Sequence, residues 1–330
     1  MTSPAAAGPN AFVTGYLATR VQPTARGSSE PYEWLRHPGP QRPRPFSPVT
    51  PGIREAAARL PREPVTLKLG TQAGTGRRYA AGSARSAGHL LAMGPDEAGW
   101  RTLRQLLHGT GRLLRSLHTE LSPASAPREA GGSARLSAWL QQGDGPGAAS
   151  RLHSLARARL GTERLKRVRA WCEEAGPGCA DAVFLHGGVS MGSLIPAAAE
   201  GGGDTRPIGS GALLAGEESA FGPAEYDIGW LLGELTEFRL RHLNGSPEAS
   251  SHCADAARQF MAGYGRRHFD AATAGRMAAL RVLTHTYDFA AYVGWNDDLH
   301  QHLDLSADLI ETDGSAALCG DVGLTTPEGK

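Results

Sequence analysis

The sequence predicts an α+β protein of two lobes, with a small β-rich lobe at the N-terminal end and a large helical lobe after it. Three observations predict this class. An apolar strand pattern at 64–69 precedes a glycine-rich turn, leucines recur at three- and four-residue steps after Asp96, and the C-terminal third has helical periodicity. We therefore expect the small lobe over 1–92, the helical lobe over 93–312 and a disordered tail over 313–330.

Composition and charge say little about the function, but they argue against some classes of partner. A chain of 330 residues can bury a substantial core, and its 34 Lys and Arg residues nearly balance 33 Asp and Glu residues. That balance argues against a nucleic-acid or membrane surface, and no apolar segment approaches the roughly 20 residues that span a bilayer. Without a secretion signal, the chain is expected in the cytoplasm. Free thiols are therefore predicted for the cysteines, which lack Cys-x-x-Cys spacing: Cys172, Cys179, Cys253 and Cys319.

Residues 1–63 have the least regular pattern of the chain. Prolines cluster toward the end of this region, where they disfavour helix and favour extended or turn structure. The first clear strand is Pro64–Leu69, which carries Lys68 among apolar residues, and a second strand is expected at His89–Met93. The glycines over 70–76 predict a hairpin turn between strands.

From Asp96 onward the pattern is helical. Leucines between Leu103 and Leu117 lie on one face of an amphipathic helix. Pro223 is expected to start another helix, because proline fits the first helical turn and apolar residues from Trp230 to Phe238 follow it. Further helices are predicted at 134–142, 148–160, 163–174, 247–263, 272–293 and 298–311.

The stretch from Ala182 to Trp230 carries the motifs. Two short apolar runs each end in polar residues, and a Gly-rich loop separates them. The first run ends in His-Gly-Gly-Val-Ser-Met-Gly-Ser at 186–193. The second continues through Gly-Glu-Glu at 216–218 and Phe-Gly-Pro to Tyr-Asp at 226–227.

This layout resembles the catalytic centre of the aminoglycoside phosphotransferase and choline kinase family, a branch of the protein-kinase fold. That family has a His-Gly-Asp-x-x-x-x-Asn loop after the first run and an Asp-Trp turn after the second. Gly111–His118 resembles the family's Gly-x-x-Leu-x-x-Leu-His helix, and Ala257–Tyr264 resembles its Phe-x-x-Gly-Tyr helix. The resemblance covers about 100–275 and implies a bilobal protein-kinase-like fold.

The resemblance also implies that the family's acidic and amide catalysts are missing. Aligned on His186, the catalytic Asp falls on Gly188 and the metal-binding Asn falls on Ser193. The later metal-binding Asp falls on Ala215. None of these replacements can take a proton at neutral pH or bind magnesium strongly. His186, Ser190 and Ser193 are then the polar residues of a degenerate catalytic loop.

Other residues near this frame have two interpretations, which the sequence leaves open. The resemblance makes Lys68 the lysine that contacts nucleotide phosphates, whereas an exposed strand lysine would fit the pattern as well. Glu217 and Glu218 are candidate substitutes for the lost magnesium ligand, or solvated turn residues. ATP and magnesium are therefore the expected cofactors unless the site binds neither. Asp227 is expected to cap its helix or hold the loop.

A rival class of function starts from Gly188–Gly192, which matches the Gly-x-Ser-x-Gly elbow of α/β-hydrolases. Ser190 would be the nucleophile, and Asp227 and His252 follow in the hydrolase order. Against this alternative, the residues after Ser190 predict an extended segment that stops at Pro196, where a hydrolase needs a helix. The helical pattern before the motif also lacks the alternating strands of a hydrolase sheet.

The missing catalysts favour a pseudokinase. A frame of this kind resembles kinase-like subunits in the maturation of thioamitides and class V lanthipeptides, which work with a lyase on Ser and Thr of a precursor peptide. The resemblance implies a lyase-like protein partner, a precursor peptide, or both. His285, Tyr287, Asp288 and Trp295 are the candidate residues for binding them, because aromatic residues favour interfaces. The alternative is an ATP-dependent phosphotransferase for small molecules such as aminoglycosides.

Overall fold

The computed structural model describes residues 11–25, 28, 30–62, 64–121, 128–178, 181–197, 209–243 and 246–319. In this part of the chain no helix is long and apolar enough to cross a membrane. Most of the tail predicted over 313–330 lies outside the described residues. Its first part forms the short helix α10 (Ser315–Cys319), so the expected disorder does not begin at 313.

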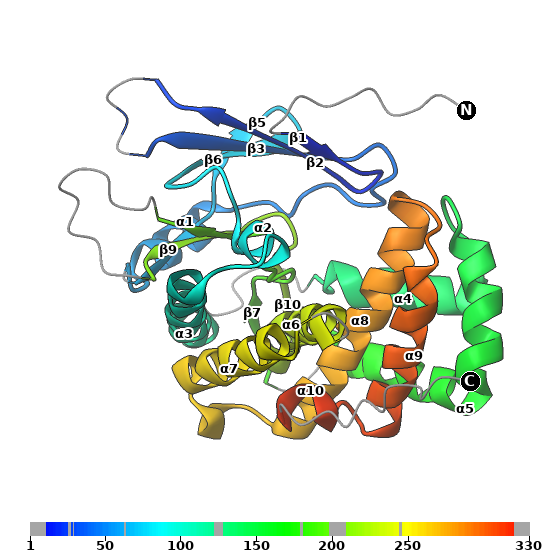
Figure 1. Cartoon of the computed structure of the whole chain (residues 1–330). Coiled ribbons are helices and arrows are strands. Elements are labelled where there is room, and N and C mark those ends of the chain that lie inside the picture. The colour runs from blue at the N-terminus through cyan, green and yellow to red at the C-terminus, as the bar shows by residue number, and fades with distance from the viewer. Residues whose placement is uncertain are drawn as a thin grey trace.

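A five-stranded antiparallel sheet forms the upper part of the structure in Figure 1. Its strands are β1 (Ala11–Val13), β2 (Leu17–Pro23), β3 (Tyr32–Pro38), β5 (Thr71–Ala73) and β6 (Gly76–Ala81), in the order β1-β2-β3-β6-β5. Three of these strands lie within 1–63, so the prediction of an irregular region was wrong. The pattern was weak because β2 and β3 bury few side chains completely. The predicted glycine turn is confirmed as the β5–β6 hairpin.

A second sheet joins the N-terminal region to the middle of the chain. β4 (Val65–Lys68) pairs in parallel with β9 (Gly211–Leu214), which pairs antiparallel with β8 (Leu194–Pro196). β7 (Val183–Leu185) and β10 (Ala220–Gly222) form a two-stranded antiparallel sheet. The strand predicted at 64–69 is therefore present, but it lies outside the five-stranded sheet. Lys68 is therefore not part of the five-stranded sheet, which covers the helical lobe.

The helices predicted from periodicity are confirmed. They are α3 (Glu97–Glu120), α4 (Gly131–Gln142), α5 (Ala149–Glu174), α6 (Glu225–Leu243), α7 (Pro247–Tyr264), α8 (Ala271–Tyr292) and α9 (Asp298–Glu311), with α1 (Pro51–Ala58), α2 (Ala87–Ala92) and the 3₁₀ turn η1 (Arg266–His268) as shorter elements. The helices expected at 148–160 and 163–174 are the two halves of α5, which is kinked at Gly161, where φ is 72°.

The strand expected at His89–Met93 is wrong, because these residues belong to α2 and its C-cap. Ser86 begins this helix: its hydroxyl accepts a hydrogen bond from the backbone N–H of His89 at 3.2 Å. The sheet ends at Ala81 and α2 begins at Ala87, so the chain passes from strands to helices ahead of the predicted boundary at residue 92.

The described residues form two hydrophobic clusters. The large one unites the long helices with β7 and β10. The small one lies under the five-stranded sheet and consists of Val21, Trp34, Tyr79, Ala81, Ile195 and Leu214. Two separate clusters are what two lobes require, because each must bury its own apolar face. The bilobal α+β prediction is confirmed (Figure 1).

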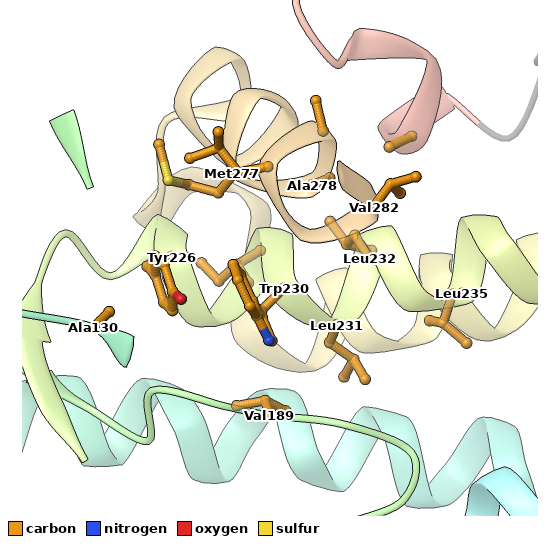
Figure 2. Packing of buried hydrophobic residues seen from close by; sticks show 14 of the residues in the cluster. Ala130, Val189, Tyr226, Trp230, Leu231, Leu232, Leu235, Met277, Ala278 and Val282 are labelled. Carbon is orange, nitrogen blue, oxygen red and sulfur yellow. The ribbon is translucent and has the colours of Figure 1, made fainter. Parts of the chain in front are cut away.

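The packing of α6 on α8 is the centre of the helical lobe. Figure 2 shows Leu232 of α6 beside Ala278 and Val282 of α8, while Trp230 and Leu231 point toward the segment that carries Val189. Gly229 lets the two helices approach closely. A Cβ at this position would lie 2.4 Å from the Ala274 carbonyl oxygen and 2.5 Å from Met277 Cβ. Packing on α8 and on the segment that carries Val189 therefore fixes the position of α6, and with it the polar residues that α6 contributes to the site.

Gly229→Ala is expected to destabilise the protein by about 1–3 kcal/mol, because the added methyl group must push α6 and α8 apart. Alanine normally stabilises a helix relative to glycine by up to about 1 kcal/mol. A decrease in the free energy of unfolding would therefore identify the packing effect. Urea denaturation measures it. The matched control is Gly52→Ala in α1, where a Cβ would meet only Thr50 Oγ1 at 4.0 Å. A midpoint unchanged in Gly229→Ala would contradict the packing argument.

Candidate functional site

A cleft of about 1210 Å³ lies between the five-stranded sheet and the helical lobe. Residues of the sheet, among them Tyr32 and Trp34, line one side. Residues of α4, α6 and α8 line the other side together with the loop 186–193 and the turn 216–218. The two motif segments singled out in the sequence therefore face the same space. This cleft is the candidate site.

The carboxylate of Asp227 holds the loop that follows β7. It accepts hydrogen bonds from the backbone N–H groups of His186 at 2.7 Å and Gly187 at 2.9 Å. Nε2 of His118, on α3, lies 3.1 Å from the same carboxylate, whose side chain is fully buried. The expectation that Asp227 holds the loop is confirmed. Because the buried carboxylate is fully used in this way, it is not available as a base for a substrate.

His186 bridges the loop to β9. Its Nε2 lies 2.8 Å from the Leu214 carbonyl oxygen, and since that oxygen can only accept, Nε2 carries the proton. Its Nδ1 accepts a hydrogen bond from the Gly188 N–H at 3.3 Å. Burial lowers the pKa of His186 below its ordinary value, against the attraction of Asp227. A neutral ring with both nitrogens engaged supports the loop and has no free nitrogen for proton transfer.

Ser190 and Ser193 are bonded to each other. The backbone N–H of each donates to the hydroxyl of the other at 3.1 Å, and the two hydroxyl oxygens lie 3.2 Å apart. Ser193 Oγ also donates to the Ser190 carbonyl oxygen at 2.9 Å. Both side chains thus shape the turn of the loop.

The α/β-hydrolase alternative is wrong. Strand β8 follows Ser190, where a nucleophile elbow requires a helix. The described strands form an antiparallel sheet of five, a mixed sheet of three and an antiparallel sheet of two, with no doubly wound parallel sheet among them. His252 stacks on Trp100 of α3, with ring centroids 4.9 Å apart, while Asp227 is bonded to the loop.

Glu217 is bound within the protein. Its carboxylate lies 3.2 Å from Nη1 of Arg36, on β3, and accepts a hydrogen bond from the hydroxyl of Tyr79 at 2.9 Å. Both partners of the ion pair are almost fully buried, with side-chain exposures of 7% and 11%. Arg36 also donates to the Gly192 carbonyl oxygen at 2.7 Å. This pair therefore joins the sheet, the loop and the turn across the cleft.

The side chain of Glu218 packs on Gly188, the position that the motif alignment assigns to the catalytic Asp. A Cβ added to Gly188 would lie 3.1 Å from Glu218 Cγ. The carboxylate accepts short hydrogen bonds from the Tyr16 hydroxyl and the Arg42 guanidinium, and Arg135 Nη1 lies 3.9 Å away. Burial alone would raise the pKa of Glu218, but Arg42 and Arg135 outweigh it and hold the pKa below its ordinary value.

The turn between β1 and β2 reaches into this network. The Gly15 N–H donates to the Tyr292 carbonyl oxygen at the end of α8, at 2.9 Å. The ring of Tyr16 lies between the guanidinium groups of Arg42 and Arg135, 4.2 Å and 4.1 Å from its centroid. In protein kinases the corresponding Gly-rich turn covers the nucleotide phosphates. Here the turn is bonded to the protein's own side chains.

The interpretation of Lys68 as the phosphate-contacting lysine does not agree with its position. Lys68 does not line the cleft, and its Nζ lies 3.6 Å from a Glu30 carboxylate oxygen. Arg36 lies instead on the third strand of the sheet, the strand that carries the phosphate-contacting lysine in protein kinases. Sequence reasoning missed Arg36, although Trp34 and Arg36 are the buried residues of one strand face and mark β3 as a strand.

Glu234 is a second residue that sequence reasoning missed. It lines the cleft from α6, and its Oε2 accepts a hydrogen bond from the Met191 N–H at 2.7 Å. Burial raises the pKa of Glu234 above its ordinary value, although Arg281 opposes this effect. Its position one helical turn after Trp230 was the feature of the sequence that placed Glu234 on the same face of the helix.

The four residues predicted to bind a peptide or partner divide into two pairs. His285 and Asp288 line the cleft, and Asp288 accepts two hydrogen bonds from Arg135 at 2.7 Å and 3.1 Å. Tyr287 is buried and packs on Trp139, so its predicted role as an accessible anchor was wrong. Trp295 does not line the cleft and lies under Arg151, 3.6 Å from its ring centroid. The four residues are close in the sequence, but closeness in the sequence does not decide which of them face the cleft.

The fold and the cleft define a bilobal protein-kinase-like structure of the aminoglycoside phosphotransferase type. A structure of an amicoumacin kinase is similar over 92% of this chain and 87% of its own chain, with 14% identity and a TM-score of 0.53. This likeness shows the fold that the motifs predicted.

Two other solved structures are similar at lower TM-scores. A glucosamine kinase has 16% identity over 94% of this chain and 82% of its own, with a TM-score of 0.45. An ethanolamine kinase from Plasmodium vivax has 13% identity over 91% of this chain and 78% of its own, with a TM-score of 0.46. No protein-family model and no curated protein matches the sequence.

Asp227→Ala is expected to lower the free energy of unfolding by about 3–5 kcal/mol, because it leaves two buried backbone N–H groups and His118 without their acceptor. Asp227→Asn keeps one acceptor oxygen and should recover part of the loss. Chemical denaturation followed by circular dichroism measures both. Asp270→Ala, which removes the N-cap of α8, is the comparison and should cost only about 1 kcal/mol. Equal losses in Asp227→Ala and Asp270→Ala would contradict the anchoring role.

Proposed function

We propose that this kinase-fold chain is a cytoplasmic pseudokinase that binds a Ser/Thr-containing precursor peptide together with a lyase-like protein partner. One observation carries the proposal. In the motif alignment, Gly188, Ser193 and Ala215 fall on the catalytic and metal-binding positions of the kinases that the sequence resembles, and the carboxylates of Glu217 and Glu218 are already bound by arginines. The frame of a kinase cleft is thus retained without a free base or a free metal ligand at these positions.

Energetics support weak nucleotide binding. A triphosphate needs cations, but Arg36 and Arg42 are each bonded to a carboxylate of the protein. Taking Arg36 from Glu217 leaves a buried, unpaired carboxylate, which costs roughly 3–5 kcal/mol. That cost lowers affinity by roughly 10²- to 10⁴-fold, since about 1.4 kcal/mol corresponds to a factor of ten. An incoming phosphate would also repel the freed carboxylate.

The size and lining of the cleft support a peptide as ligand. Its volume of about 1210 Å³ exceeds the roughly 300–1,000 Å³ of usual small-molecule pockets. Tyr32 lines it from the sheet and is only partly buried, whereas the side chains of Trp34 and Trp230 at its wall are buried. Aromatic side chains with apolar bodies and polar tips favour peptide and protein interfaces. The setting in thioamitide or class V lanthipeptide maturation follows from the resemblance of the motifs.

The second candidate is an ATP- and magnesium-dependent phosphotransferase acting on a small molecule. The observation that favours it is the position of Glu218, whose methylene groups pack on Gly188 and whose carboxylate would have to turn toward Gly188, after release by Arg42 and Arg135, to act as a base. The similar amicoumacin kinase structure is a complex with AMP-PNP and Ca²⁺. Because general-base catalysis contributes about 10²–10⁴-fold, this candidate requires that release.

Calorimetric titration with ATP and Mg²⁺ distinguishes the candidates. We expect no saturable binding at micromolar nucleotide, because Arg36 and Arg42 are neutralised by Glu217 and Glu218. The double variant Glu217→Ala and Glu218→Ala frees Arg36 and Arg42 and is expected to bind ATP more tightly than the unaltered protein. Tight magnesium-dependent binding by the unaltered protein that this double variant abolishes would make the two carboxylates metal ligands and favour the phosphotransferase.

Tyr32→Ala is expected to weaken capture of a lyase-like partner or a Ser/Thr-rich precursor peptide about tenfold or more, because Tyr32 lines the cleft and is only partly buried. A pull-down from the native host, followed by titration of the recovered component, measures the change. Trp295→Ala, which alters an aromatic residue outside the cleft, is the control and should leave binding unchanged at equal folded protein. Equal weakening in both variants would place the binding surface elsewhere.

A further inference from the structure

Three potential metal ligands converge behind the cleft, away from the loop 186–193. They are Glu237 of α6, His285 of α8 and His302 of α9, whose ligand atoms all lie within 4.8 Å of one another. Among the described residues no other group of three His, Cys, Asp or Glu side chains meets this condition. They come from three different helices, so neither a helical repeat nor a local turn explains why they meet.

We propose that Glu237, His285 and His302 bind a divalent transition-metal ion of the Zn²⁺ class. Two imidazoles and one carboxylate are a ligand set that zinc uses in sites that keep an open coordination position. Such a set prefers transition metals over magnesium, which takes oxygen ligands. The site is therefore chemically distinct from the nucleotide-linked magnesium site that the kinase motifs imply.

The hydrogen bonds around the three residues orient two of them as ligands. Nδ1 of His302 lies 2.9 Å from the Asp298 carbonyl oxygen, so it carries the proton and leaves Nε2 with its lone pair. A backbone carbonyl on the second ring nitrogen is the usual support of a metal-binding histidine. Glu237 is nearly buried, and its Oε2 lies 3.3 Å from Arg281 Nη1, which leaves Oε1 toward His285 at 2.9 Å.

Small movements suffice to close the site. Two ligands with bonds of about 2.1 Å to one zinc ion lie at most about 4.2 Å apart. The separations of up to 4.8 Å exceed this limit only slightly. The side chain of His285 is 43% exposed and can rotate, whereas Glu237 is fixed by Arg281. An ordinary Glu237–His285 ion pair would explain those two residues but not the approach of His302.

The site opens to a cavity that a ligand can reach. Its three residues line a pocket of about 620 Å³ between α6, α8 and α9, and His285 and Glu234 line both this pocket and the main cleft. The open coordination position therefore takes water or a carboxylate, imidazole or thiolate donor of a molecule bound in the cleft. The inference does not depend on the proposed function, because its residues are separate from Gly188, Ser193 and Ala215.

Metal titration of the full chain, freed of metal with EDTA, tests the proposal. We expect one equivalent of Zn²⁺ to bind in competition with a chromogenic chelator. His302→Ala and Glu237→Gln should each weaken binding by about tenfold or more, since even loss of a supporting group costs that much. His300→Ala is the matched control on the same helix and should bind as the unaltered protein does. Co²⁺ should give visible absorption bands that His302→Ala removes.

Other outcomes overturn the proposal. No zinc binding by the unaltered protein would exclude the site, as would binding that His302→Ala leaves unchanged. An equal loss in His300→Ala and His302→Ala would indicate adventitious histidine binding at the surface. Since Glu237→Gln also removes a partner of Arg281, circular dichroism checks that each variant is folded. His302 has no ion-pair partner among the described residues, so His302→Ala decides the question if Glu237→Gln fails to fold.

Discussion

The buried carboxylate of Asp227 is the contact on which the geometry of the cleft depends. It collects two backbone N–H groups of the loop and the ring of His118, which come from separate parts of the chain. Asp227 stands on α6, and α6 is fixed by close packing on α8. The loop therefore keeps its place through an interaction that needs no catalytic side chain. The contacts of Asp227 with the loop thus involve neither Gly188 nor Ser193.

The charges inside the cleft are balanced by the protein itself. Arg36 pairs with Glu217, and Arg42 pairs with Glu218. In a kinase, phosphates and magnesium supply the charges that meet such groups. A low-dielectric interior makes each pair costly to separate, because the partner left behind stays buried. The same pairs also tie β3 and the β1–β2 turn to the turn 216–218 and so help to hold the two sides of the cleft together.

The rim of the cleft that α6 and α8 form carries other polar side chains than the region around the loop 186–193. His285 and Glu234 face both the main cleft and the pocket between α6, α8 and α9. Arg281 pairs with Glu237 on this side, whereas Arg36, Arg42 and Arg135 pair with Glu217, Glu218 and Asp288. The two sides of the cleft therefore present different ion pairs. A peptide long enough to occupy the cleft would meet both, whereas a small molecule would meet one.

The long helices and the motif frame were predictable from the sequence, because helical periodicity, proline starts and strand-end motifs are local properties of the chain. The assignment of Gly188, Ser193 and Ala215 to the catalytic positions rests on the order of the motifs alone. Only the tertiary structure decided that Arg36 and not Lys68 enters the cleft, that Tyr287 is buried, and that Glu218 meets Tyr16. The last two residues are 202 positions apart, and such contacts depend on how the lobes pack. Periodicity records which face of an element is apolar, but it carries no information on which distant charge will lie opposite.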